Sequence, residues 1–308
     1  MKIVEIGVVL VTYNRLEKLK TALASFERQS LAPAYLIVVD NASTDGTSDY
    51  LASWEKEPGR FQRIVLSKTE NTGGSGGFCA GLKAALEYSA PWIWVSDDDA
   101  FPEEETLKTA AKYLSENQWA DQPSAICGAV INHGEVDLEH RRRIRPGRFG
   151  IKEESVRLEE YAEESFQLNG FSYVGVILNR EKLRQVGLTR EDYFLWYDDT
   201  EHSLRLSRTG PVYCVPGIRI HHDVPPAQGG VSWKNYYGIR NMITTYKEHF
   251  PKRHALYVSL RLVLKAAAGC LLGKNKKWNR MAFHGVADAW TGKMGLHPVY
   301  RPGWETKK

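Results

Sequence analysis

The feature of this 308-residue sequence that most limits its fold is a repeated unit, in which an apolar segment ends in a polar loop and a helical pattern follows. The four polar loops span residues 12–15, 40–45, 71–77 and 97–99. Alternating strand and helix patterns predict an α/β fold with a doubly wound parallel sheet. Ligands of such sheets bind at the carboxyl ends of the strands, where we expect all four loops to meet.

Three adjacent aspartates, Asp97, Asp98 and Asp99, follow the apolar segment Trp92–Val95. Adjacent carboxylates repel one another unless a positive charge lies among them, and divalent cations prefer such oxygen ligands. The residues alone leave two interpretations open. One is a metal site; the other is an exposed acidic turn that also caps a helix expected from about Pro102 to Leu114.

A glycine-rich segment follows the third predicted strand. Between Asn71 and Phe78, four of five consecutive residues are glycine, which permits unusual backbone angles and a close approach of a ligand. A helix predicted from about Phe78 to Tyr88 would point its N-terminus at that ligand. The segment lacks the pattern of a phosphate-binding loop of the GxxxxGK[ST] type, and a flexible linker is the alternative.

Residues 132–168 break the alternation of strands and helices. A basic run, His140–Arg145, is followed by an acidic run, Glu153–Glu164. We interpret the region as an insertion or mobile loop beside the site. The alternative is that the two runs pair with each other on the surface.

A second group of carboxylates lies further along the chain. Asp198, Asp199 and Glu201 follow an aromatic segment and begin a predicted helix, whose N-terminus tolerates negative charge. Capping that helix would need one aspartate rather than the whole group. A histidine pair, His221 and His222, ends a short predicted strand and offers candidate metal ligands.

The charge is unevenly distributed. Residues 231–308 hold 15 lysines and arginines against 3 aspartates and glutamates, whereas residues 1–230 hold 26 against 34. We therefore divide the chain into a main unit, 1–230, and a basic helical C-terminal region, 231–308. Within the latter, residues 251–280 resemble a basic amphipathic helix and its continuation lying on an anionic membrane surface. An ordinary packed helix is the alternative, and we expect no nucleic-acid partner.

The sequence predicts no helix that spans a membrane, because it has no uninterrupted apolar run of 18 residues. The N-terminus lacks the layout of a signal peptide. The four cysteines form no CxxC pair, which argues against a zinc site or a disulfide framework. We expect a cytoplasmic protein, at most peripherally bound to the inner face of the plasma membrane.

Several motifs, in combination and in order, carry a resemblance to a known family. They are Val9–Arg15, Val38–Ser43, Asn71–Gly77, Asp97–Asp99, Trp196–Glu201, Val215–Gly217, His221–His222 and Tyr236–Asn241. Over roughly residues 4–250 the chain resembles family 2 glycosyltransferases of the GT-A fold, and among them it is most similar to bacterial galactofuranosyltransferases. The resemblance implies a Rossmann-like, mostly parallel sheet flanked by helices, with a C-terminal helical extension.

The resemblance also implies a site for a divalent cation, Mn²⁺ or Mg²⁺, and for the diphosphate of a nucleotide-sugar donor. Asp97 and Asp99 would hold the cation with His222 as third ligand, although the neighbouring His221 leaves that choice open. Asp40 would accept a hydrogen bond from a uracil ring. The residues implied to bind the nucleotide or donor are Thr12, Tyr13, Arg15, Asp40, Asn41, Asn71, Gly73, Gly74, Gly76 and Asp98.

By the same resemblance the transfer would be inverting, with Asp199 as the base that takes the proton of the acceptor hydroxyl. The residues alone do not separate Asp199 from Asp198 in this role. Trp196 and Tyr197 offer flat apolar surfaces of the kind on which sugars stack. Asp198 or Glu201 would position the acceptor.

The expected function is transfer of a sugar, galactofuranose as first choice, from its UDP donor to a hydroxyl of a glycan or lipid-linked acceptor in bacterial cell-surface polysaccharide synthesis. Transfer from dTDP-rhamnose or from a UDP-hexopyranose is the alternative within the family. The alternative from outside the enzymes is a non-catalytic module that binds an anionic surface. The chain is shorter than many polymerising members, which implies the addition of one or a few sugars.

Overall fold

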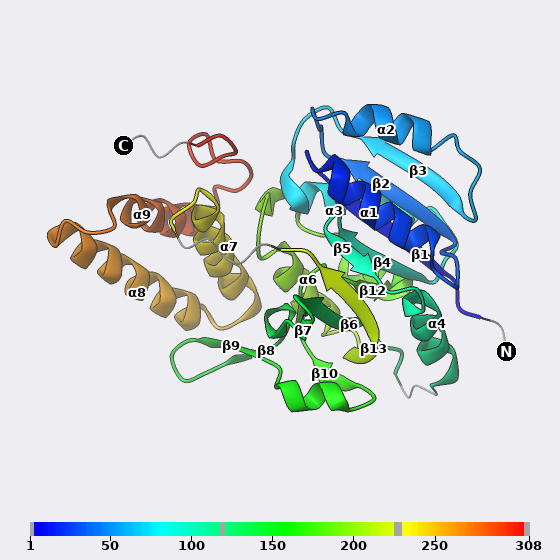
Figure 1. Ribbon diagram of the computed structural model, residues 1–308. Coiled ribbons are helices and arrows are strands. Elements are labelled where there is room, and N and C mark those ends of the chain that lie inside the picture. Colours follow the sequence, from blue (N-terminus) through cyan, green and yellow to red (C-terminus); the bar gives the residue numbers. More distant parts are fainter. Residues whose placement is uncertain (1–2, 118–120, 225–229, 305–308) are drawn as a thin grey trace.

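The structure is a computed structural model that describes residues 3–117, 121–224 and 230–304. Its strands are β1 (Ile6–Thr12), β2 (Tyr35–Asp40), β3 (Gln62–Ser67), β4 (Trp92–Asp97), β5 (Ala100–Pro102), β6 (Ala125–Asn132), β7 (Glu135–Val136), β8 (Arg141–Pro146), β9 (Ile151–Ser155), β10 (Phe166–Leu168), β11 (Gly170–Phe171), β12 (Val176–Asn179) and β13 (Val212–His222). Within the described residues, ten strands form one sheet in the order β10-β13-β6-β12-β4-β1-β2-β3, with β5 paired to β13 and β7 to β6 (Figure 1).

Helices cover both faces of this sheet. They are α1 (Leu16–Glu27), α2 (Thr47–Trp54), α3 (Gly73–Ala85), α4 (Thr106–Glu116), α5 (Arg180–Val186) and α6 (Asp198–Leu206). On β1, Val8 and Leu10 pack into a core that includes α1, α2 and α4. Val9 and Val11 pack into a second core that includes α3, α5 and α6. Burial on both faces explains why the sequence of this strand is continuously apolar rather than alternating.

The first half of the chain is the predicted parallel sheet. β1 pairs in parallel with β2 and β4, and β2 pairs in parallel with β3. This register sets Thr12 beside Asp40 and Val11 beside Asp97. Because the strands end together, the polar residues that follow them meet at one edge.

The second half of the sheet is mixed, so the sheet as a whole is mostly parallel, as the resemblance implies. β12 runs antiparallel to both of its neighbours, β4 and β6. β13 is one strand that runs parallel to β6, with a register shift between Val215 and Arg219. Its last residues pair with β5, which sets His222 opposite Ala100 beside the aspartates.

The region 132–168 forms regular structure, so the expectation of a mobile loop is wrong. β8 pairs with β9 and β11 in a separate three-stranded sheet, and two 3₁₀ turns, η1 (Leu138–His140) and η2 (Leu158–Ala162), flank it. Arginines of the basic run pair with glutamates of the acidic run, as the alternative interpretation anticipated. The pairs are Arg142 with Glu153 at 2.8 Å, Arg143 with Glu160 at 2.6 Å, and Arg145 with Glu154.

The glycine-rich segment is not a loop ahead of a helix. α3 begins at Gly73, so the glycines form its first turns, and the predicted start at Phe78 is wrong. Small residues are required there because Cβ atoms at Gly77 and Gly81 would lie 2.5 Å and 2.4 Å from side chains of β1. The glycines therefore bring the helix close to the strand.

The C-terminal region consists of three helices, α7 (Lys234–His249), α8 (Lys252–Leu271) and α9 (Lys276–Thr291), within the described residues. They confirm the C-terminal helical extension that the resemblance implies. They form a separate apolar cluster and lie to one side of the central sheet (Figure 1). A further 3₁₀ turn, η3 (Glu191–Tyr193), precedes α6 on the side that faces α7. The division of the chain at residue 230 stays a prediction.

By length and composition alone, α8 could cross a bilayer, and 22% of its most apolar 18-residue window is buried. Charged residues interrupt this window. Our sequence criterion, an uninterrupted apolar run of 18 residues, therefore did not detect it. A single helix of this kind is weak evidence for a membrane span, because the length and composition of α8 also fit a helix that lies on a membrane surface.

Candidate active site

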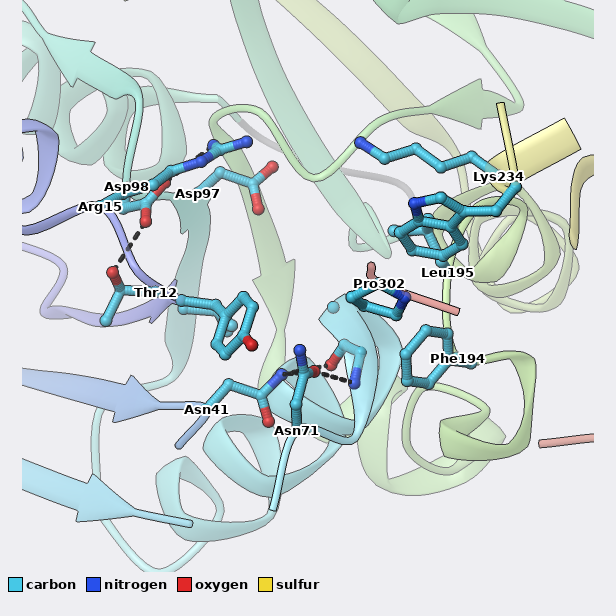
Figure 2. A pocket seen from close by; sticks show the side chains of 15 residues that line it. Thr12, Arg15, Asn41, Asn71, Asp97, Asp98, Phe194, Leu195, Lys234 and Pro302 are labelled. Carbon is cyan, nitrogen blue, oxygen red and sulfur yellow. Dashed lines mark hydrogen bonds and ion pairs between the residues drawn. The ribbon is translucent and has the colours of Figure 1, made fainter. Parts of the chain in front are cut away.

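Two adjoining cavities lie at the carboxyl ends of the central strands. The smaller has a volume of about 260 Å³ and the larger about 570 Å³. Figure 2 shows the smaller cavity, to which all four predicted loops contribute. Arg15, Gly74, Asp97 and Leu195 line both cavities, so these residues mark where the two meet.

Most of the residues implied to bind a nucleotide line the smaller cavity, and the others lie behind its lining. Eight of them line the smaller cavity, with Asp97 beside them: Thr12, Tyr13, Arg15, Asn41, Asn71, Gly73, Gly74 and Asp98. Asp40 does not line it. Its side chain accepts hydrogen bonds from the Ser43 backbone N–H at 3.0 Å and the Ser48 hydroxyl at 2.5 Å, and it is 1% exposed. Its implied contact with a base stays a prediction.

Asn41 ties the second loop to the start of α3. Its amide group donates to the Asn71 side chain at 3.1 Å and to the Gly73 carbonyl at 2.9 Å, and its oxygen accepts from the Thr72 backbone at 3.1 Å. Gly73 has φ +73°, and a Cβ there would lie 1.8 Å from the Phe194 carbonyl oxygen. Gly76 lines neither cavity, and the Thr72 side chain fills the space that a side chain at this position would need. Gly74, by contrast, faces open space between the two cavities.

Asp98 is held by two donors and is 3% exposed. Thr12 donates its hydroxyl hydrogen bond at 2.7 Å and Arg15 donates at 3.1 Å. Burial raises the pKa of the Asp98 carboxyl, although Arg15 and Thr12 oppose the change. Asp98 therefore positions Arg15 at the cavity edge (Figure 2).

Asp99 lies between Arg15, which donates at 2.7 Å, and His222, whose Nε2 lies 3.4 Å from its carboxylate. Burial alone would raise the pKa of Asp99, but the contacts with His222 and Arg15 outweigh it and lower the pKa. His221 points elsewhere and pairs with Glu103 at 2.9 Å. Of the two histidines, the structure therefore places His222 beside the aspartates.

Asp97 lines both cavities and accepts no hydrogen bond from the described residues. Burial, and then the charges of Asp99 and Asp98, raise the pKa of Asp97 well above its usual range. A bound cation would relieve this repulsion. The Nδ1 atom of His222 is also buried without a partner in the described part of the chain. Two carboxylates and one imidazole form a donor set suited to Mn²⁺ or Mg²⁺.

A tighter set of possible ligand atoms lies elsewhere. Among the described residues, Glu201, Glu248 and His249 form the set whose ligand atoms all lie within 4.8 Å of one another. Glu201, however, already accepts three hydrogen bonds from Arg205 and pairs with His249 at 3.0 Å. The positive charge of Arg205 therefore already balances the Glu201 carboxylate. The ligand atoms of Asp97, Asp99 and His222 do not all lie within 4.8 Å of one another. Asp97 must therefore approach Asp99 and His222 if these three are to coordinate one ion.

Glu201 is not in the acceptor position that the sequence suggested. It is 2% exposed and lies outside both cavity linings, and its contacts with Arg205 and His249 lower its pKa to about 2 despite burial. The signal was available, because Glu201 and Arg205 are four residues apart, the spacing of ion pairs on one helix face. Trp196, Tyr197 and Asp198 do line the larger cavity.

Asp198 and Asp199 begin α6 and line the larger cavity together with the Asp97, Asp99 and His222 set. Burial, and then the charge of Asp199, raise the pKa of Asp198 to about 7. Burial also raises the pKa of Asp199, and Arg142 opposes it. One oxygen of Asp199 accepts from the Thr200 backbone at 2.5 Å, which leaves the other oxygen for a ligand.

The segment before α6 has an unusual backbone. Phe194, Trp196 and Tyr197 have φ angles of 65°, 63° and 67°, a region that side-chain-bearing residues rarely adopt. Asn241 on α7 donates to the carbonyls of Tyr193, Leu195 and Trp196 at 3.0, 2.9 and 2.9 Å. Arg240 also donates to the Tyr193 carbonyl, at 2.9 Å. α7 thus holds the segment that presents Asp198 and Asp199.

Sequence reasoning missed several residues of the site. The C-terminal region adds Trp233, Lys234 and Pro302 to the smaller cavity (Figure 2). The three-stranded insertion adds His140 and Arg142 to the larger one. Arg142 donates to the Thr200 hydroxyl at 2.7 Å and so connects the insertion to α6. His140 and Arg142 belong to the basic run that the sequence placed beside the site, but no local pattern shows which side chains reach the cavities from these distant parts of the chain.

Known proteins resemble this chain along most of its length. It is 27% identical over 263 residues to galactofuranosyltransferase GlfT1 of Mycolicibacterium smegmatis, which covers 81% of this chain and 79% of the relative. It is 26% identical over 271 residues to the dTDP-rhamnosyl transferase RfbF of Shigella flexneri, covering 83% of each.

Solved structures share the fold at low sequence identity. Staphylococcus aureus TarS 1–349 in complex with UDP-GlcNAc matches with a TM-score of 0.61 and 14% identity, covering 92% of this chain and 80% of that one. The mannosyltransferase PcManGT from Pyrobaculum calidifontis, solved with GDP-Man and Mn²⁺, matches with a TM-score of 0.57 and 16% identity, covering 94% and 88%. The family model for glycosyl transferase family 2 matches residues 7–187. The chain therefore belongs to glycosyltransferase family 2 and has the GT-A fold, with a C-terminal helical extension.

Proposed function

We propose that this glycosyltransferase is a metal-dependent, inverting enzyme that moves a sugar from a UDP donor to a hydroxyl of a glycan or lipid-linked acceptor. Galactofuranose is the proposed sugar, because GlfT1 is among the relatives that the chain resembles along most of its length. One observation carries the mechanism. The larger cavity brings Asp97, Asp99 and His222 to the same space as Asp199, about a hundred residues away in the sequence.

The smaller cavity is the proposed nucleotide site. It is bounded by Tyr13, Asn41 and Asn71 on one side and by residues of the C-terminal region on the other. Its junction with the larger cavity, at Asp97 and Arg15, is the proposed place of the diphosphate. The sugar would then lie in the larger cavity, over Gly74, where a side chain would take up space.

Asp97, Asp99 and His222 would hold the divalent cation, which would act as a Lewis acid on the leaving diphosphate. The high pKa of Asp97 and the unpartnered Nδ1 atom of His222 support this assignment. Asp198, which lines the acceptor side, would position the acceptor with Trp196 and Tyr197.

Asp199 is the proposed base. The acceptor oxygen attacks the anomeric carbon, the bond from that carbon to the diphosphate oxygen breaks, and the nucleoside diphosphate leaves with the electron pair. The free oxygen of Asp199 takes the proton of the acceptor hydroxyl. Attack from the face opposite the leaving group inverts the anomeric carbon, and it requires a carboxylate separate from those beside the diphosphate.

A rhamnosyltransferase that uses dTDP-rhamnose is the second candidate. RfbF is nearly as similar to this chain as GlfT1, at 26% against 27% identity, and covers slightly more of it. The two donors differ in both base and sugar, so a binding comparison separates them. We further propose that the addition takes place on the cytoplasmic side of the membrane.

The donor assay tests the proposed function. With Mn²⁺ or Mg²⁺, the purified protein should transfer sugar from UDP-galactofuranose to galactoside acceptors faster than from dTDP-rhamnose or UDP-hexopyranoses. Removal of the metal by EDTA should lower the rate to background, and added Mn²⁺ should restore it. Mass and linkage analysis of the product identifies the transfer. Equal rates with and without EDTA would contradict the metal assignment, and a preference for dTDP-rhamnose would replace the donor.

We also propose that α8 lies on an anionic membrane, which would bring a lipid-linked acceptor to the site. Leu256, Leu260 and Leu264 recur every four residues along α8 and are 61%, 55% and 59% exposed. The β8–β9 turn extends this surface, because the Phe149 ring lies 5.9 Å from the Tyr257 ring. The sequence from Pro251 to Ala287 contains no acidic residue. Exposed leucines amid unopposed basic residues are typical of helices on anionic membranes.

Replacing Leu256, Leu260 and Leu264 together with serine should reduce binding to vesicles that contain phosphatidylglycerol by at least about tenfold, since each lost leucine removes about 1.5–3 kcal/mol of burial. Binding of the unchanged protein should fall as salt rises. Flotation measures both effects. Leu158→Ser, which changes a leucine that is 57% exposed on η2, is the matched control. A triple variant that binds vesicles normally but changes oligomeric state would assign this surface to a second copy.

A further inference from the structure

The smaller cavity contains a cation that the proposed mechanism does not use. Lys234 is the first residue of α7 and lines this cavity with Arg15, Asp97 and Asp98. Figure 2 shows its side chain extending across the cavity, with its amino end turned toward Arg15. Its Nζ atom lies 6.0 Å from the centroid of the Trp233 ring. The positive side chains of Arg15 and Lys234, which lie far apart in the sequence, therefore face the same space.

The ammonium group of Lys234 has no direct partner among the described residues. None of them forms a hydrogen bond or an ion pair with its ammonium group, whereas Arg15 bonds to both Asp98 and Asp99. Burial, and then the charge of Arg15, lower the pKa of Lys234, and the charge of Asp99 only partly opposes them. A half-buried cation that faces a like charge is unfavourable unless an anion binds between the two.

The chemistry of that anion follows from the position of the pair. Arg15 and Asp97 mark the junction of the two cavities, where the donor diphosphate would lie under the proposed function. A nucleoside diphosphate gains negative charge as the bond to the sugar breaks, so a cation at its oxygens stabilises the transition state more than the ground state. An ammonium group is a compact point charge that can follow the phosphate as it departs.

We propose that Lys234 binds the diphosphate of the donor from the side opposite Arg15 and stabilises the charge of the departing nucleoside diphosphate. This inference rests on the proposed function, because it requires a nucleotide donor in the smaller cavity. It makes α7, and so the C-terminal region, a direct part of the donor site.

The test compares binding of uridine, UMP and UDP in the presence of Mn²⁺ by calorimetry. Lys234→Gln should weaken UDP binding by about 10- to 100-fold, the loss expected for one charge-assisted contact, and should leave uridine binding unchanged. Lys234→Arg should recover part of the loss. Lys83→Gln, which removes an exposed lysine near the end of α3, is the control and should change neither.

Transfer kinetics give a second readout. Lys234→Gln should lower kcat and raise KM for the donor, because the contact strengthens as the leaving group gains charge. Equal weakening of uridine and UDP would overturn the proposal. If the unchanged protein binds dTDP instead of UDP, the donor assignment fails while the comparison of thymidine with dTDP still tests Lys234. If it binds no nucleoside diphosphate, both proposals fail.

Discussion

Asp199→Asn is expected to lower the rate of transfer by about 10²- to 10⁴-fold, the contribution of a positioned general base. The amide has the shape of the carboxylate but cannot take the acceptor proton. Because the change is isosteric and Thr200 can still donate to the side-chain oxygen, the fold and UDP binding should be retained. Initial rates with saturating donor and acceptor measure the effect. A variant with normal kcat would remove Asp199 from the mechanism.

The pH dependence gives a further check on this assignment. A base must be unprotonated, so the rate of the unchanged protein should fall as the pH drops through the pKa of Asp199. Burial raises that pKa, so the fall should begin at a higher pH than for an ordinary aspartate. Asp199→Asn should lose this limb of the profile.

Asp198 provides the comparison that the sequence could not supply. Its folded-state pKa of about 7 exceeds the usual value of 3.8, so its protonated form favours the fold. This contribution is complete below pH 3.8 and is lost as the pH rises through 7. Asp198→Asn should therefore raise the unfolding temperature at pH 8 and have little effect near pH 3. If Asp198 were the base, its replacement would abolish transfer and that of Asp199 would not.

How much of this site the sequence predicts depends on how local its signals are. Thr12 and Asp97 end strands with clear apolar runs and Asn41 directly follows another, so their meeting at one edge follows from a parallel sheet. The glycine segment was placed correctly but misread as a loop, because glycine is disfavoured in helices and only close packing on β1 reveals why these residues are helical.

The remaining errors come from contacts between distant segments. In the insertion the two charge runs pair with each other across the β8–β9 hairpin and between β8 and η2, a pairing that the sequence offered only as an alternative. Lys234 lies 219 positions after Arg15, and nothing near it in the sequence marks a cavity. Asp97 and Asp199 were found because carboxylate groups stand out, whereas a single lysine in a basic region does not.

The motif around Asn241 shows how a residue without substrate contact can control a site. Its amide carries two hydrogens and serves three carbonyls, so one hydrogen is shared. The three residues with positive φ that it faces cost about 1–3 kcal/mol each. A segment so strained keeps its shape only while such contacts hold it, and this segment sets the place of Asp199.

Asn241→Asp is therefore expected to lower kcat by about 100-fold or more, because a carboxylate would face three carbonyl oxygens and the loss of one buried polar partner alone costs about 1–3 kcal/mol. Asn241→Ala should have a smaller effect of the same direction. Asn279→Ala is the matched control, since it removes a buried asparagine of α9 that bonds to the Lys274 carbonyl at 2.8 Å, far from α6 in the sequence. Asn241→Ala and Asn279→Ala should both unfold at a lower temperature than the unchanged protein, so stability alone does not distinguish them.

Only the Asn241 variants should lose turnover at a temperature where all of the variants remain folded. Equal turnover in Asn241→Ala and Asn279→Ala would show that the strained segment keeps its shape without this clamp.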